Sequence, residues 1–170
     1  MKSLAHDFKH SAPLHVWIVS IAVTLAVLVI AWFVMPDFVD PGNRPGLREM
    51  VGIAVVAFFF PALFEETIFR GLLNLRQSWF SMILSTLAFI AWHPLVGLFF
   101  QANVREAMSD PRFLIFVATF GILFCLFRRW GKSMWVPILC HWIITVIWKG
   151  LGGAQFWSGA SLGLGAGDIS

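Results

Sequence analysis

The sequence has little charge: Asp, Glu, Lys and Arg make up 12% of its 170 residues, about half the share in an ordinary soluble domain. Hydrophobic residues make up 59%, and the mean hydropathy is +0.82. This composition excludes a soluble globular protein and predicts an integral membrane protein. The net charge of +3 is small and scattered, so we expect no nucleic-acid partner.

Cysteine is scarce, and the sequence has neither a common zinc-binding signature nor an internal repeat. Cys125 and Cys140 both fall in apolar stretches, where buried free thiols are expected rather than a disulfide. The zinc signature His-Glu-x-x-His does not occur. No internal repeat is visible, which argues against a proton-coupled carrier, the weakest of the functions considered.

Long apolar stretches predict an all-α, polytopic membrane helix bundle with about five transmembrane helices. Their expected ranges are 13–35, 47–75, 79–100, 113–127 and 134–148. The polar residues 101–112 are expected to form a loop. The glycine-rich tail, 151–170, is expected to be flexible or to lie at the membrane interface. No loop is large enough for a second domain, so residues 1–170 are predicted to form one membrane-embedded domain.

The N-terminal region resembles a signal peptide, but the apolar run 13–35 is long enough to span and no small-residue cleavage site follows it. We therefore expect an uncleaved anchor. Lys and Arg are almost equally divided between the two sides, and the densest cluster, 128–132, falls on the N-terminal side. This favours a cytoplasmic N-terminus in a cell (inner or plasma) membrane. Three histidines here are expected to be solvated interface residues: His6, His10 and His15.

Charged residues interrupt the second predicted span at Glu65, Glu66 and Arg70. Charge in hydrocarbon is costly and is kept mainly for function. Glu66 and Arg70 are four residues apart with the acid first, the favourable order for a helical ion pair. The side chain of Glu65 is rotated by about 100° around the helix axis from that of Glu66, and it has no obvious local partner. Because a carboxylate kept from water is a stronger base than one in water, we predict Glu65 as the catalytic base.

Two histidines, His93 and His141, occur in later apolar segments. A helix rise of about 1.5 Å per residue puts Glu65 about 14 Å, His93 about 21 Å and His141 about 10–14 Å from one membrane face. Boundary errors allow all three to share one level. One imidazole could share a water with Glu65 and the other could stabilise an oxyanion. Thr145, one turn after His141, adds a hydroxyl on the same face.

Each of these residues also has a structural interpretation. An intramembrane histidine can be a packing residue, Thr145 can bond back to the carbonyl four residues earlier, and Glu66 with Arg70 can be only a clamp. Two histidines and a glutamate can also bind zinc. However, a clamp does not need Glu65, and pairing with Arg70 reduces the carboxylates left for a metal. The residues therefore favour a functional site with no metal and no cofactor.

Three motifs occur in chain order: Glu65-Glu66-x-x-x-Arg70-Gly71, Phe89-x-x-x-His93, and His141 near the end. A helix, a basic turn and a second helix lead to the last motif over residues 121–141. Together they resemble the CAAX-processing and bacteriocin-processing (CPBP) intramembrane proteases over about residues 50–148. The resemblance implies a glutamate-dependent, metal-independent intramembrane endopeptidase.

The resemblance also implies roles for single residues. Glu65 and His93 would activate the water, Glu66 and Arg70 would support them, and His141 would contribute to the oxyanion hole. The family usually has Asn four residues after this last histidine. Here the residue is Thr145, whose hydroxyl donates one hydrogen bond but reaches less far than an amide.

The predicted function is hydrolysis of a peptide bond near a membrane segment or a lipidated or C-terminal sorting tail. The expected partners are a membrane protein or peptide substrate and the lipid bilayer, and the sequence assigns no oligomeric state. The alternative is a catalytically inactive membrane scaffold, or a bacteriocin-immunity-type protein, that binds a peptide in the same cavity. Thr145 in place of Asn is the main support for that alternative.

Overall fold

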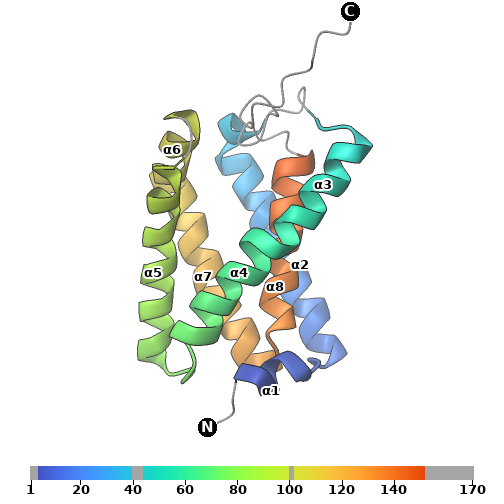
Figure 1. Cartoon of the computed structure of the whole chain (residues 1–170), viewed down its shortest axis with the longest axis vertical. Coiled ribbons are helices and arrows are strands. Elements are labelled where there is room, and N and C mark those ends of the chain that lie inside the picture. Colours follow the sequence, from blue (N-terminus) through green and yellow to red (C-terminus); the bar gives the residue numbers. More distant parts are fainter. Residues whose placement is uncertain (1–3, 40–43, 100–101, 152–170) are drawn as a thin grey trace, which may run out of the picture.

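The computed structural model describes residues 4–39, 44–99 and 102–151, and these ranges contain helices and no strand (Figure 1). Within them, four helical segments are long and apolar enough to cross a membrane, and a fifth apolar helix, Trp135–Gly150, is shorter. The four are α2 (Leu14–Val34), Leu47–Leu73, α5 (Trp79–Gly97) and α7 (Pro111–Gly131). The prediction of an all-α membrane bundle is therefore confirmed, and the protein is an integral membrane protein.

The last two helices lie at the centre of the packing. α8 (Trp135–Val146) contacts α2, α3 (Leu47–Ala57) and α7, while α5 packs against α7 on the other side of the bundle (Figure 1). The main buried cluster joins Val16 of α2, Phe124 of α7 and Cys140 of α8. Cys125 and Cys140 are both buried and free, as expected. This packing holds α8 against the second span, which carries the two glutamates.

The second span is not the continuous helix that the sequence predicted over 47–75. It consists of α3, π-helical turns Phe58–Leu63, the short α4 (Phe64–Glu66) and further π-helical turns Thr67–Leu73. Phe60 leaves helical geometry at φ −141° and ψ 115°. The cause is Pro61, whose ring cannot follow a regular helical turn and which lacks a backbone N–H. The break lies one turn before Glu65.

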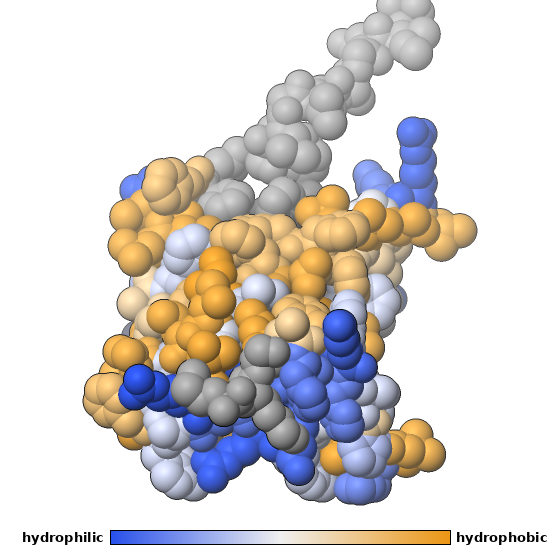
Figure 2. Space-filling model, turned by 60° about the horizontal axis from the view of Figure 1, so that its bottom comes forward, coloured by the Kyte–Doolittle hydropathy of each residue, from blue (hydrophilic) through white to orange (hydrophobic). Residues whose placement is uncertain are grey.

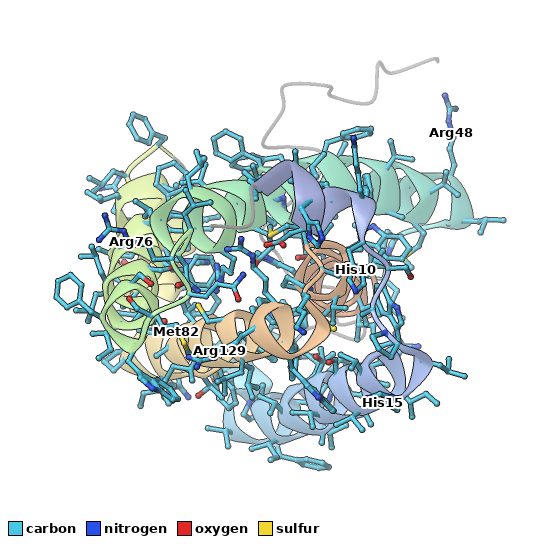
Figure 3. All side chains as sticks on the ribbon, turned by 90° about the horizontal axis from the view of Figure 1, so that it is seen from below. His10, His15, Arg48, Arg76, Met82 and Arg129 are labelled. Atoms are coloured by element: carbon cyan, nitrogen blue, oxygen red, sulfur yellow. The ribbon has the colours of Figure 1, made fainter. Side chains whose placement is uncertain are left out.

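A short helix, α1 (Leu4–Lys9), closes one end of the bundle, and hydrophilic residues gather on this end (Figure 2). Figure 3 views this end from below and labels basic and histidine side chains there: His10, His15, Arg76 and Arg129. Arg48, in contrast, points away from the bundle (Figure 3). His6, His10 and His15 are exposed, as expected. Arg128, counted above among the loop cations, is instead 1% exposed and paired with Asp7.

The predicted loop 101–112 is wrong over most of its length, because α6 (Ala102–Ser109) is a helix. Val104 is buried, and Met108, one turn later, lies against Gly97 at the end of α5. A polar segment thus becomes helical because one apolar stripe finds a partner. Asp110 then caps α7 by accepting a hydrogen bond from the Arg112 backbone N–H. The predicted tail 151–170 lies outside the described residues, except Leu151.

Candidate active site

Glu65 lies in α4, immediately after the break at Pro61, and its side chain points into the bundle. The residue is 4% exposed. Its Oε1 accepts a hydrogen bond of 3.0 Å from the indole N–H of Trp92 on α5. Its Oε2 lies 3.9 Å from Nε2 of His141 and accepts no hydrogen bond from the described residues. One carboxylate oxygen is therefore fixed by protein, and the other faces an imidazole just beyond hydrogen-bond distance.

Glu66 is fully buried and joins two partners. Its Oε1 lies 2.8 Å from Nδ1 of His141, and its Oε2 lies 3.2 Å from Nε of Arg70, the i,i+4 partner expected from the sequence. Arg70 also lies over the ring of Phe89, with Cζ 3.9 Å from the centroid. Such a cation–π contact adds to the stability of a buried guanidinium. Glu66 thus connects Arg70 on its own span to His141 on α8.

The imidazole of His141 consequently lies between two carboxylates, with Nδ1 toward Glu66 and Nε2 toward Glu65. A hydrogen bond at one ring nitrogen fixes the orientation of the ring and the task left to the other nitrogen. Phe89 and Phe124 pack around the ring, with centroids at 6.0 and 5.7 Å. His141 is 8% exposed. It is held rigidly, and its Nε2 is directed at Glu65.

His93 and Thr145 lie on the same cavity but do not touch the Glu65 carboxylate. Nδ1 of His93 donates a hydrogen bond of 2.8 Å to the carbonyl of Phe89, and among the described residues it forms no hydrogen bond or ion pair with Glu65. The Thr145 hydroxyl donates to the carbonyl of His141 at 3.0 Å. This back-bond within the helix is the structural alternative noted from the sequence.

A cavity of about 170 Å³ brings these groups together. Its polar side chains are few, and Leu28, Ala31, Phe120 and other apolar residues form most of the wall. Among the described residues, the ionisable ones that line it are Glu65, His93, His141 and Lys149. A mostly apolar pocket with a few convergent polar groups is the usual form of a small active site or binding site.

The described residues do not form a recognisable group of metal ligands. Glu65 and Glu66 face opposite nitrogens of His141, so their carboxylates do not converge with the imidazole on one point. Within the described ranges, no group of three or more His, Cys, Asp or Glu residues is arranged to bind a metal. A zinc site needs three or four ligands around one centre.

Two residues of the cavity were not singled out from the sequence. Trp92, next to His93, holds one oxygen of Glu65. Lys149 was assigned only to the end of the last span, yet it lines the cavity. A signal existed for Lys149, since it follows His141 and Thr145 at a constant spacing of four residues. For Trp92 there was no signal, because a tryptophan in an apolar segment more often packs or lies at the interface.

Comparison with known proteins identifies the family of the chain. A protein-family model described as "Type II CAAX prenyl endopeptidase Rce1-like" matches residues 47–147, which is more than half of the chain. No curated protein and no solved structure matches the chain. The matched range contains the charged motif of the second span, His93 and His141. The chain therefore belongs to the Rce1-like family, and its resemblance to the CPBP proteases is confirmed.

Proposed function

We propose that the protein is an intramembrane endopeptidase in which Glu65 activates a water molecule to hydrolyse a peptide bond. The observation that carries the proposal is the buried Glu65 carboxylate, which faces His141 across 3.9 Å at the wall of an apolar cavity. The proposed substrate carries a lipidated tail of the prenylated CAAX type or another C-terminal sorting tail, and the family description supports the first of these.

The chemistry follows from the partners of each group. Oε2 of Glu65 takes a proton from water while the water oxygen attacks the peptide carbonyl carbon. The carbonyl oxygen becomes an oxyanion, and the tetrahedral intermediate then loses the amine as the C–N bond breaks. Glu65 returns its proton to the leaving nitrogen. The products are one new carboxylate and one new amine, and no metal takes part.

The two histidines have different roles in this proposal. His93 donates a hydrogen bond from Nδ1–H to the Phe89 carbonyl, so the Nε2 of its neutral ring can accept a hydrogen bond from the water. His141 is the imidazole near Glu65 and is oriented by Glu66 through Nδ1. It would contact the oxyanion by donating Nε2–H, a role that requires a proton on both ring nitrogens. Arg70 holds Glu66 in place. The Thr145 hydroxyl must leave the His141 carbonyl before it can donate to an oxyanion.

The test is cleavage of a farnesylated CAAX-type peptide by the purified protein in liposomes. Glu65→Gln keeps the shape of the side chain and removes the base, so we expect cleavage to fall by at least 10³-fold, on the order expected for loss of an activated water. Glu106→Gln makes the same change at an exposed carboxylate of α6 and is the matched control. Cleavage by Glu65→Gln at the wild-type rate would refute the mechanism. A chelator should leave the rate unchanged, and loss with recovery on adding Zn²⁺ would favour a metalloprotease.

A second candidate is a catalytically inactive scaffold that binds a peptide in this cavity. It is favoured by one observation, that the Thr145 hydroxyl donates to the His141 carbonyl of its own helix, at the position where the resemblance noted from the sequence leads us to expect Asn. Under this alternative, wild-type protein binds the peptide without cleaving it. Binding then survives both Glu65→Gln and His93→Ala.

We also propose that the N-terminus lies in the cytoplasm and that the host membrane is the cell (inner or plasma) membrane. The support is the basic end of the bundle, where Arg76 and Arg129 lie (Figure 3). Lys9 belongs to the last turn of α1 and Lys132 follows α7. Because both native cysteines are buried, a cysteine that replaces the exposed His10 is a specific site for chemical labelling. A membrane-impermeant maleimide should label the His10→Cys variant only after the membrane has been permeabilised, so that the reagent reaches the cytoplasmic side. Labelling in intact cells would reverse the orientation.

A further inference from the structure

Trp92 donates a hydrogen bond to Glu65, yet no step of the proposed hydrolysis uses it. Its indole N–H lies 3.0 Å from Oε1 of the Glu65 carboxylate. Trp92 belongs to a stripe of α5 that lines the cavity at helical spacing: Phe89, Trp92, His93 and Val96. This stripe places a polar hydrogen beside the carboxylate that we propose as the base.

The ring of Trp92 is held in place by aromatic packing. It lies against the rings of Phe64 and Phe69 on the second span, with centroids at 6.5 and 6.1 Å. Trp92 also packs against a buried cluster that contains Phe69. A tryptophan side chain has only two rotatable bonds, so contacts of this kind leave it little freedom. The indole N–H is therefore oriented toward Glu65 by packing alone.

This orientation matters because a carboxylate has two equivalent oxygens. The last torsion of a glutamate side chain is broad and roughly two-fold, so the two oxygens can exchange places when nothing holds them. The hydrogen bond from Trp92 removes this equivalence at Glu65. Oε1 is fixed to α5, and Oε2 is left on the side of the His141 imidazole, 3.9 Å from its Nε2.

The chemistry of indole determines which of the two oxygens can hold a proton. An indole N–H donates and cannot accept. A protonated Oε1 would be a poorer acceptor for this N–H than a carboxylate or carbonyl oxygen is, and a buried donor that loses its acceptor is costly. A proton that Glu65 takes up is therefore directed to Oε2, while Oε1 remains the acceptor for Trp92.

We propose that Trp92 is a positioning residue for Glu65 and makes Oε2 the oxygen that takes the proton from water. The inference rests on the proposed peptidase function and adds to it the group that selects the reacting oxygen. Trp92 acts through Glu65 and contacts neither the water nor the peptide bond in this role. The proton that Oε2 receives is the one later returned to the leaving nitrogen, so one oxygen serves both halves of the reaction.

The test removes the N–H of Trp92 and keeps an aromatic ring. Trp92→Phe does so approximately. Replacement of Trp92 by benzothienylalanine does so closely, because sulfur takes the place of N–H in a ring of nearly the same shape. For both, we expect kcat on the farnesylated peptide in liposomes to fall by about 10–100-fold, as for loss of a partner that orients a reacting group. KM should stay within about twofold of the wild-type value, because the lost contact is not one with the substrate.

The matched control is Trp135→Phe, which also removes one indole hydrogen bond. The indole of Trp135 donates to the Phe8 carbonyl at 2.8 Å, at the end of the bundle that α1 closes, and Trp135 is not among the residues that line the cavity. Its kcat should stay within about twofold of wild type. Thermal midpoints in detergent check that every variant is folded.

Two kinetic results would overturn the inference. One is a wild-type kcat in the benzothienylalanine variant, since the N–H would then be dispensable. The other is a rise in KM with kcat unchanged, which would mean that Trp92 binds the peptide rather than positioning Glu65.

Indole ¹⁵N–¹H NMR in detergent micelles detects the hydrogen bond without any cleavage. The Trp92 signal is assigned by its loss in Trp92→Phe. Glu65→Leu removes the acceptor, so this signal should move upfield in the proton dimension while the Trp135 signal stays in place. A Trp92 signal that does not respond to Glu65→Leu overturns the inference.

The failure of this inference can be distinguished from the failure of the proposed function. If Glu65→Gln abolishes cleavage and both Trp92 variants cleave at the wild-type rate, the positioning role alone fails. If wild type does not cleave, or Glu65→Gln cleaves like wild type, the proposed function fails and the positioning role fails with it.

Discussion

Two buried arginines, Arg128 and Arg70, hold their charges in different ways. Nε and Nη2 of Arg128 donate to Asp7 at 3.1 and 2.6 Å, and its Nη1 donates to the backbone carbonyls of Arg70 and Asn74. The guanidinium of Arg70 has the Glu66 ion pair and the face of Phe89, but no hydrogen bond from its nitrogens to the described residues. All three nitrogens of Arg128 donate to a partner, whereas no nitrogen of Arg70 donates a hydrogen bond to the described residues.

This difference separates a structural centre from a functional one. A buried charge is least costly when its donors have partners, so an arginine whose three nitrogens all donate serves as a structural clamp. An incompletely bonded network keeps capacity for other groups, which an active site requires. The two are connected, because Arg128 donates to the backbone of Arg70. The clamp that closes one end of the bundle also fixes the turn that carries the site.

The largest effect should come from breaking the clamp. Arg128→Met leaves the Asp7 carboxylate buried without its partner, so we expect a loss of about 3–5 kcal/mol in the free energy of unfolding. The measurement is reversible unfolding in mixed micelles with increasing denaturing detergent. Arg129→Met, at the exposed neighbour, is the control and should cost less than about 1 kcal/mol. Equal losses for the two variants would mean that the Asp7–Arg128 pair is not a clamp.

At the functional centre, Glu66→Gln should lower the stability less than Arg128→Met does, and its main effect should be on peptide cleavage. The amide keeps a contact to His141 but removes the charge opposite Arg70, so we expect a loss of about 1–3 kcal/mol in stability. Peptide cleavage should fall by about 100-fold, because His141 loses the partner that orients it. Both quantities are measured on one preparation. A variant that loses stability without this fall in cleavage would place Glu66 with the structural residues.

The positions of the spans could be predicted from sequence because long apolar runs dictate them. Observed α2 and α5 begin within one residue of the predicted starts, at Leu14 and Trp79. The errors arise where tertiary contacts decide. α6 is helical because Val104 and Met108 pack on neighbouring elements, which composition does not reveal. The effect of Pro61 was missed although the residue itself was a visible helix breaker.

Four residues that the sequence singled out line one cavity, namely Glu65, His93, His141 and Thr145, but the contacts among them could not be predicted. Depth along the helices indicated that Glu65, His93 and His141 could share a level. Rotation about each helix axis and the tilt of the spans then determine that His141, rather than His93, approaches Glu65. The Asp7–Arg128 pair joins residues 121 positions apart. No local pattern specifies such a pair, which forms only when α1 closes the bundle.

A smaller effect is expected at Thr145, which lines the cavity but is bonded within its own helix. Thr145→Val removes the hydrogen bond to the His141 carbonyl, so stability should fall by about 0.5–1.5 kcal/mol. Because that bond already uses the hydroxyl proton, cleavage should change by less than about tenfold. The check is kcat on the farnesylated peptide, with Thr145→Ser as the variant that keeps the hydroxyl. A fall of about 100-fold would assign the hydroxyl to the oxyanion hole.

The smallest effect should come from a third arginine, Arg112, at the other end of the bundle. Its side chain donates to Asp37 and Asp110 at the surface, and these hydrogen bonds hold the pKa of each carboxyl below its usual range. Folded pKa values below the unfolded ones contribute stability at neutral pH that is lost as pH falls through the folded pKa. The thermal midpoint of wild type should therefore drop slightly more than that of Arg112→Met between about pH 6 and about pH 3. An equal drop would mean that this exposed cluster adds nothing.

The central claim is that Glu65 activates water rather than attacking the peptide itself, and a single-turnover reaction in H₂¹⁸O tests it most directly. With enzyme in excess over the farnesylated peptide, mass spectrometry follows the label in the new carboxyl group and in the Glu65 side chain. Direct attack by water predicts one ¹⁸O in the product from the first turnover and none in Glu65. An unlabelled product together with ¹⁸O in the Glu65 carboxylate would contradict the account, since the glutamate oxygen would then have formed the new bond.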